Sequence, residues 1–398
     1  MKRSLFISFF SLVLINTIVF AQKVSDFSVD LNKAGDGVII NKYKGSVTDV
    51  VIPSIIEGYP VTELANECFK DTKVTSIKLP NGIIRIGEDC FLNCNSLKSI
   101  NLPDTLTYLG ASAFQDTKSL TVVTIPESVK TFGNDLAEFK SWVGLFGRSG
   151  IKKIVFSGYR ESISANIFKD VNDIYTETFW GDLEKTWESS VEEIVLPKGL
   201  KKIDSKTFYT MGKLKILAIP DTVIEIGEYA FYGCFSLPSI NIPASVIEIG
   251  ECAFQYCTNL KTIIIPNSVK KIGEGCFANC ENLKSATLPN NIKEISQSLF
   301  IRSGLTSIVI PPTVEIIGIV AFHDTQLTDI TFPSGLKEIQ GGAFNNCSKL
   351  RNLVFPDSIS SINFGTVTIN NKTYSAFSNC DSLTIASKAK LRNLGYKE

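Results

Sequence analysis

Hydrophobic positions recur along the chain with a fixed period. From Pro197 onward, four successive segments each run 23 residues from one proline to the next. Apolar residues fall at the same places in each segment, and polar residues fill the places between. A fixed period in this range is typical of a solenoid, in which each repeat is one turn of a coil. The segments begin at Pro197, Pro220, Pro243 and Pro266.

Aligning the segments predicts which side chains are buried. No repeat can bury its apolar face alone, so stacking would turn each aligned column into a continuous stripe inside the coil. The clearest columns are Ile203, Ile226, Ile249 and Ile272, then Phe208, Phe231, Phe254 and Phe277, then Leu214, Leu237, Leu260 and Leu283.

The end of each segment, with the pattern L-x-x-I-x-L-P, predicts a strand. It alternates apolar and polar positions and is rich in Val, Ile and Thr, which favour strands. Parallel strands of neighbouring repeats would lie about 4.8 Å apart. The proline ends the strand because it has no N–H for the ladder. The Ile-Gly pair, as at Ile226 and Gly227, predicts a bend.

The longer pattern L-x-x-I-x-L-P-x-x-V-x-x-I-G-x-x-A-F-x-x-C resembles the BspA-like, or treponemal-type, leucine-rich repeat. It is almost complete in residues 237–257 and 260–280, and the resemblance extends over roughly residues 38–386. It implies a curved, right-handed repeat solenoid of the α/β type, mostly β, that is secreted or displayed at a cell surface. It also implies a role in adhesion or protein recognition and brings no catalytic residues.

The two ends of the chain differ from the repeats. Residues 1–21 predict a cleaved secretory signal, since Lys2 and Arg3 precede an apolar run that ends at Ala21. An uncleaved membrane anchor is the alternative, although the apolar run is short for a spanning helix. Residues 22–52 predict a cap with a hairpin, and residues 53–386 the solenoid. Residues 387–398 predict a second cap, with a helix over 387–394 ended by Gly395.

The regular spacing breaks at three places, which predicts loops that leave the coil. Residues 145–151 still match residues 299–305, so the repeat continues beneath the extra residues. The predicted loops are residues 134–143, 169–190 and 363–373.

The charge and the histidine content of the chain limit the classes of function that we expect. Lys plus Arg and Asp plus Glu number 40 each, so the net charge is zero and no global field would attract nucleic acid. His323 is the only histidine, and we expect it to be a surface turn residue. One histidine there cannot assemble a nucleophile, base and orienting group. We expect no catalytic residues, cofactor, metal, nucleic-acid partner or membrane insertion of the mature chain, and a monomer.

The ten cysteines follow the repeat. A secretory route favours disulfides, but stacked residues keep their Cβ atoms about a strand spacing apart, wider than the ~3.8 Å of a disulfide. We therefore predict buried free thiols that pack as small apolar groups. Zinc at C-x-x-x-C pairs such as Cys90 and Cys94 is an alternative, without a histidine to complete a site. Six occupy one column: Cys94, Cys234, Cys257, Cys280, Cys347 and Cys380.

All three tryptophans fall in or beside the two central loops. Tryptophan is enriched at binding hot spots, and loops carry function more often than scaffolds. A local satellite core over the irregular coils is the alternative. The candidate ligand-binding residues are Trp142, Tyr175, Phe179, Trp180 and Trp187.

Outward positions of the predicted strands, such as Ser239 and Asn241, would make a broad face of small polar and β-branched groups. This face is either a solvated sheet or an extended recognition surface. Two function classes follow. The first is adhesion or recognition of an extracellular protein. The second is carbohydrate binding, of a surface glycan, by the loop aromatics. A third class, ranked after these two, is a structural spacer within an envelope.

Overall fold

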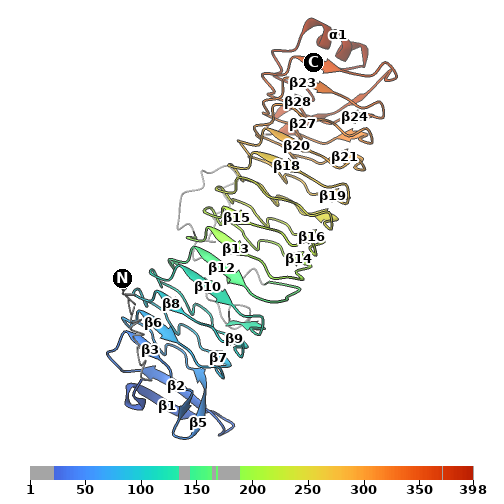
Figure 1. Ribbon diagram of the computed structural model, residues 1–398. Coiled ribbons are helices and arrows are strands. Elements are labelled where there is room, and N and C mark those ends of the chain that lie inside the picture. Colours follow the sequence, from blue (N-terminus) through green and yellow to red (C-terminus); the bar gives the residue numbers. More distant parts are fainter. Residues whose placement is uncertain (1–21, 134–143, 164–166, 169–188, 370, 398) are drawn as a thin grey trace, which may run out of the picture.

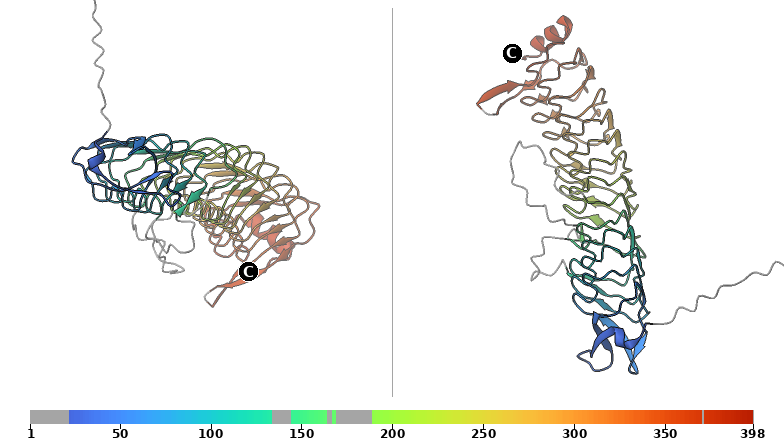
Figure 2. Two further views of the ribbon diagram at one scale, coloured as in Figure 1. Left: turned by 90° about the horizontal axis from the view of Figure 1, so that it is seen from below. Right: turned by 90° about the vertical axis from the view of Figure 1, so that its left-hand side faces the viewer.

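The computed structural model describes residues 22–133, 144–163, 167–168, 189–369 and 371–397. They form a bent rod of stacked coils, with the N-terminal hairpin at one end and helix α1 at the other (Figures 1 and 2). The predicted mostly β solenoid is confirmed. Each regular coil has three sides, called here the proline side, the glycine side and the turn side.

The proline side carries the predicted strands, most of which lie just before the column proline. Its strands pair in parallel and in register, so Ile263 of one coil faces Ala286 of the next. They are β3 (Asp49–Val51), β6 (Ser76–Lys78), β8 (Ser99–Ile100), β10 (Val122–Ile125), β12 (Lys153–Phe156), β13 (Glu193–Val195), β15 (Ile216–Leu217), β18 (Thr262–Ile264), β20 (Ser285–Thr287), β23 (Asp329–Thr331) and β25 (Asn352–Val354).

The glycine side carries a second set of mostly two-residue strands that end in the column isoleucine, also parallel and in register. The following glycine allows close approach between coils, because a Cβ on Gly250 would lie 2.5 Å from the backbone nitrogen of Glu228. The strands are β5 (Tyr59–Leu64), β7 (Arg85–Ile86), β9 (Tyr108–Leu109), β11 (Thr131–Phe132), β14 (Lys202–Ile203), β16 (Glu225–Ile226), β17 (Glu248–Ile249), β19 (Lys271–Ile272), β21 (Glu294–Ile295), β22 (Ile316–Ile317), β24 (Glu338–Ile339) and β26 (Asn363–Phe364).

The turn side runs from the column glycine to the column cysteine and is bonded from coil to coil without strands. Two residues of positive φ flank the column phenylalanine, for example Tyr229 (φ 54°) and Gly233 (φ 69°) around Phe231. The Phe231 N–H donates to the carbonyl of Ala253 in the next coil, at 2.7 Å. This bond repeats from coil to coil and so satisfies backbone N–H and C=O groups that the short strands leave unpaired.

The core is the set of predicted columns. Phe231, Phe254 and Phe277 are fully buried, and their ring centroids stack 5.0 and 5.5 Å apart at 4°. Each ring thus packs against its counterparts in the adjacent coils, which is how a solenoid buries surface that one repeat cannot.

A predicted hairpin closes the N-terminal end. After η1 (Val24–Asp26), β1 (Phe27–Leu31) pairs antiparallel with β2 (Val38–Tyr43), and β4 (Ile55–Ile56) pairs antiparallel with β5. The Tyr43 ring stacks on Phe69 at 5.1 Å, and its N–H donates to the Cys68 carbonyl at 3.0 Å. The hairpin therefore continues both the aromatic column and the turn-side ladder.

The C-terminal end is closed by helix α1 (Ile385–Asn393), which begins two residues before the predicted start. Thr384 caps it, its hydroxyl accepting from the Ser387 N–H at 3.3 Å, and Gly395 follows it at φ 96°. The Tyr396 ring lies edge-on to Phe377 at 5.6 Å. Its hydroxyl accepts from the Phe377 N–H at 3.2 Å, in place of a next coil.

The third predicted loop is an antiparallel hairpin of β27 (Thr366–Ile369) and β28 (Lys372–Ser375), which projects from the coils (Figure 2). It begins later than expected, because Asn363 and Phe364 pair with β24. The loop predicted at 134–143 lies outside the described residues, as does 169–188. Ser190 belongs to the coil, since its hydroxyl donates to the carbonyls of Ser149 and Ile151 at 2.8 and 2.7 Å.

The cysteine prediction is confirmed. All ten thiols are free, and all but the half-buried Cys252 are buried. Burial raises the pKa of the Cys280 thiol to about 12. Each column cysteine donates to the carbonyl of the column phenylalanine one coil before it. The Sγ–O distances are 3.0 Å for Cys94, 3.3 Å for Cys234 and Cys257, 3.2 Å for Cys280, 3.1 Å for Cys347 and 3.0 Å for Cys380.

Candidate binding surfaces

The five aromatic residues predicted to bind a ligand lie outside the described residues, so their role stays a prediction. These residues are Trp142, Tyr175, Phe179, Trp180 and Trp187. The described residues 167–168, just before this segment, belong to the core. Phe168 packs between Phe156 and Phe208, with ring centroids 6.2 and 5.5 Å away.

The outward proline-side positions form the predicted face of small polar and β-branched groups. It is most apolar in the C-terminal half, where Ile264 is 68% exposed and Val309 83% exposed. Along its strand, Ile264 alternates with the buried Ile263. The column, one residue per coil, is Ile264, Thr287, Val309, Thr331 and Val354; we call it the aliphatic column.

A depression of about 290 Å³ opens beside Val309. In the described part of the chain, no backbone hydrogen bond joins residues 307–310 to either neighbouring coil. Two prolines in succession, Pro311 and Pro312, follow this segment and supply no donors. The parallel ladder is therefore open here between β20 and β23. The lining residues are Ile308, Val309, Ile310, Pro312, Asp329, Ile330, Thr331, Phe332 and Pro333.

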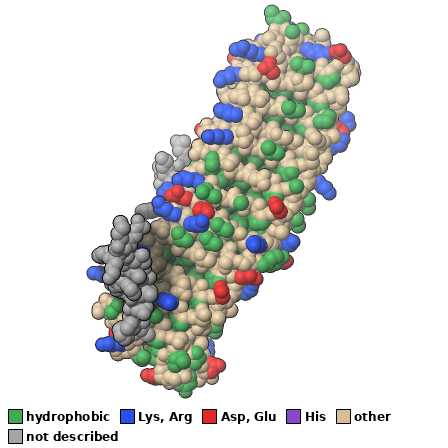
Figure 3. Space-filling view, viewed as in Figure 1, with side chains coloured by type: hydrophobic (Ala, Val, Ile, Leu, Met, Phe, Trp, Pro, Cys, Tyr) green, Lys and Arg blue, Asp and Glu red, His purple; other side chains and the backbone are tan. Residues whose placement is uncertain are grey.

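Basic residues recur at the start of the proline-side strands, two positions before the inward residue such as Ile263. Other residues, among them Glu192, Thr306 and Thr328, take this position in several coils. We call this position the basic column. In the middle of the rod it is neutralised, since Lys215 and Lys152 both reach Glu192, at 2.9 and 3.7 Å. Further on, neither Lys261 nor Lys284 has a carboxylate partner among the described residues. Figure 3 shows blue side chains following one another along the edge that carries β18, β20 and β23.

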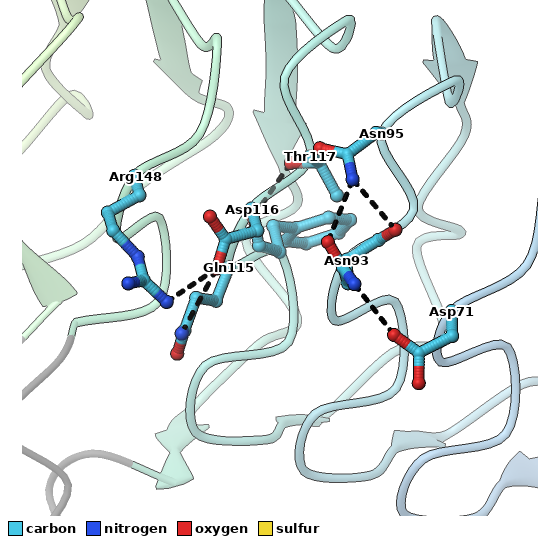
Figure 4. Close-up of polar contacts among 8 residues, drawn as sticks. Asp71, Asn93, Asn95, Gln115, Asp116, Thr117 and Arg148 are labelled. Atoms are coloured by element: carbon cyan, nitrogen blue, oxygen red, sulfur yellow. Dashed lines mark hydrogen bonds and ion pairs between the residues drawn. The ribbon is translucent and has the colours of Figure 1, made fainter.

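On the turn side, polar residues of positive φ are bonded to one another across coils (Figure 4). Asn93 donates to the Asp71 carboxylate at 2.8 Å, and Arg148 pairs with Asp116 at 2.7 Å. Asn and Asp tolerate positive φ better than most residues, which explains their presence here. These side chains form hydrogen bonds and ion pairs with one another, so the stack stabilises the turns and is not a candidate binding site.

A tyrosine cluster on the turn side was not predicted. The rings of Tyr209 and Tyr232 stack at 4.9 Å, and Tyr256 meets Tyr232 edge-on at 5.3 Å. The Lys206 ammonium lies 5.7 Å from the ring centroids of both Tyr209 and Tyr229. Tyr209 and Tyr232 share one aligned position in the sequence, and that signal could have revealed the cluster.

On the glycine side, opposite charges pair from one coil to the next. Lys202 meets Glu225 and Lys271 meets Glu248, each at 2.7 Å. Glu315 is paired on both sides, with Lys293 at 3.0 Å and with Lys337. The hydrogen bonds from these two lysines lower the pKa of Glu315 to about 2.

His323 is half-buried rather than a surface residue as predicted. It does occupy the turn-side position after Phe322, but its Nδ1 is buried without a hydrogen-bond partner, and burial lowers its pKa. The reason is packing against the adjacent turn, whose Arg302 N–H donates to the His323 carbonyl at 2.8 Å. Among the described residues, no three or more His, Cys, Asp or Glu side chains are placed to hold a metal ion.

The sequence matches the model of the BspA type leucine-rich repeat region, in six copies, over residues 62–186, 186–306 and 293–397. The chain belongs to the BspA-type leucine-rich repeat family. This confirms the resemblance that the aligned columns indicated. No curated protein matches the chain.

Solved structures of bacterial leucine-rich repeat proteins share the fold of this family member. A leucine-rich repeat protein from Bacteroides ovatus is 22% identical with a TM-score of 0.61, covering 91% of this chain and 93% of that one. A leucine-rich cell surface protein from Faecalibacterium prausnitzii is 24% identical with a TM-score of 0.42, covering 84% and 94%. Within the described residues, no helix combines the length and apolarity needed to cross a bilayer.

Proposed function

We propose that this BspA-type protein is a non-catalytic recognition protein, secreted or held at the cell surface, that binds other proteins in adhesion. The observation that carries the proposal is the proline-side face. In most of its strands the residues on either side of a buried inward residue are exposed, as with Ile263 between Thr262 and Ile264. A rigid core thus presents outward columns along the rod, a geometry suited to extended contacts.

Affinity capture tests this proposal. The chain from residue 22 onward is immobilised and exposed to surface extracts, with a second bait lacking residues 169–188. The deletion spares Ser190, which bonds to the neighbouring coil. A protein retained by both baits supports recognition by the coils. A protein retained by the intact bait alone assigns recognition to the insertion. Absence of any specific protein would contradict the proposal.

Secretion has its own test. The predicted signal at residues 1–21 leaves Gln22 as the first residue after cleavage. N-terminal sequencing of the exported protein should therefore start at Gln22. A protein retained with Met1, in a membrane fraction, would favour the uncleaved anchor instead.

Carbohydrate binding is the second candidate, and the tyrosine cluster favours it. Tyrosine offers an apolar ring with a polar tip, which suits the faces and hydroxyls of a sugar. A glycan array compares the wild type with Tyr232→Ala and with the double variant Trp180→Ala, Trp187→Ala. Glycan binding that either variant loses supports this function and assigns it to the cluster or to the loop aromatics. No binding by the wild type rejects it.

A further inference from the structure

We propose that the C-terminal half of the proline side binds an extended, acidic segment of a partner protein with β-branched side chains. The site combines the aliphatic column, the depression beside Val309, and the basic column at Lys261 and Lys284. This inference rests on the proposed recognition function and specifies the chemistry of the partner.

The apolar part of the site is exposed above the core. Ile264 and Val309 are 68% and 83% exposed, while Ile263 and Ile330 are buried at 2% and Ile308, beside Val309, is partly buried. Ile264 is held on the ladder of β18 and β20, so it loses little freedom on binding, which favours association. The five positions of the column span four coil spacings, or about 19 Å, which about six residues of extended chain would cover.

The charge of the site specifies the sign of the partner. Lys261 and Lys284 lie on adjacent coils, and Arg351 occupies the same column in the coil of β25. Asp329 lines the depression, and hydrogen bonds from the Thr328 hydroxyl, at 2.7 Å, and from the Asn352 amide lower its pKa. It lies two coils beyond Lys284, and Lys261 and Lys284 have no carboxylate partner within the described structure. Complementary charge across an interface favours carboxylates on the partner and steers encounter.

The opened ladder adds a place for a side chain. The depression of about 290 Å³ has aliphatic walls at Ile308 and Ile330 and an aromatic wall at Phe332. Pockets of this kind receive the anchoring side chains that dominate binding energy. A Val, Ile or Leu of the partner fits this lining.

A displayed library of random 12-residue peptides tests the site, with the purified chain as target. We expect enrichment of peptides that alternate β-branched residues with Asp or Glu. Val309→Asp should weaken the enriched peptides at least about tenfold, because it places a carboxylate at the rim of the depression, where it repels the acidic residues of the peptide. Ile224→Asp, on the glycine side, is the matched control and should bind like the wild type.

Charge reversal sharpens the test. In the double variant Lys261→Glu, Lys284→Glu, the selection should shift from acidic to basic peptides. The control Lys270→Glu, on the glycine side, should keep the acidic preference. All these side chains are exposed, so unchanged circular dichroism spectra and thermal midpoints should accompany each variant. Peptides without acidic bias, or equal binding to both reversals, would overturn the site. The proposed recognition function would survive that result if affinity capture still retained a protein. An empty selection also rejects the site.

Discussion

The glycine side and the C-terminal half of the proline side cover the same core, but they differ in whether their charged side chains form ion pairs. On the glycine side, Glu315 is held between Lys293 and Lys337. On the proline side, Lys261 and Lys284 stack without carboxylates among the described residues, next to an exposed Val309. Like charges directly opposite each other on a ladder are unfavourable. The glycine side therefore pairs its charges within the array, whereas Lys261 and Lys284 of the proline side lie next to each other without such pairing.

Breaking the core should have the largest effect, and should affect both faces equally. Phe254→Ala removes a ring that contacts Phe231 and Phe277 on either side. We expect the free energy of unfolding to fall by about 3–5 kcal/mol, as for other buried aromatic residues replaced by alanine. Urea denaturation measures the change, with Val309→Ala as an exposed control. A loss below about 1 kcal/mol would contradict the stacked core.

The second effect concerns the buried thiols and high pH. Burial raises the pKa of Cys280 to about 12 and raises that of Cys257 as well. Unfolded thiols ionise near pH 8.5, so above that pH the unfolded chain binds fewer protons than the folded one. Stability should therefore fall from about pH 8.5 upward, by as much as about 1.4 kcal/mol per pH unit for each thiol.

Thermal or urea midpoints between pH 7 and 11 measure this dependence. The double variant Cys257→Ala, Cys280→Ala lacks two of the thiols and should show a shallower decline than the wild type. Identical declines in the two proteins would show that these thiols do not govern the alkaline loss of stability.

The columns could be predicted because each depends on side-chain type at a fixed spacing. Phe254 and Cys257 lie where the alignment put them. The depression beside Val309 could not be predicted, because it depends on backbone bonds that do not form before Pro311 and Pro312. Half-burial of His323 depends on the packing of the next turn, which a single position does not encode. The loop aromatics such as Trp180 stay a prediction.

A smaller effect should come from the paired face. The lysine hydrogen bonds lower the pKa of Glu315 to about 2, so its contribution is present above the unfolded pKa near 4.3 and is lost as pH falls toward 2. At pH 7 and low salt, Glu315→Gln should therefore unfold at a slightly lower urea concentration than the wild type. The difference should shrink with added salt and vanish near pH 2. A difference that persists there would mean that packing, not charge, is responsible.

The smallest effect is expected on the face left open. Val309→Ser changes a side chain that is 83% exposed, so the free energy of unfolding should stay within about 0.5 kcal/mol of the wild type. Urea denaturation is again the measurement. A loss comparable to that of a core substitution would show that Val309 supports the fold, and would remove the contrast between the two faces.

The turn-side bonds give the rod a direction. At every described turn where Phe231 and its counterparts donate, the donor lies in the earlier coil and the acceptor in the later one. On this side, a bare N-terminal end would offer carbonyl acceptors and a bare C-terminal end N–H donors, so the two ends would complement each other head to tail. Contacts of that kind do not close and can grow into filaments. Tyr43 and Tyr396 each satisfy one such group, which removes part of this complementarity.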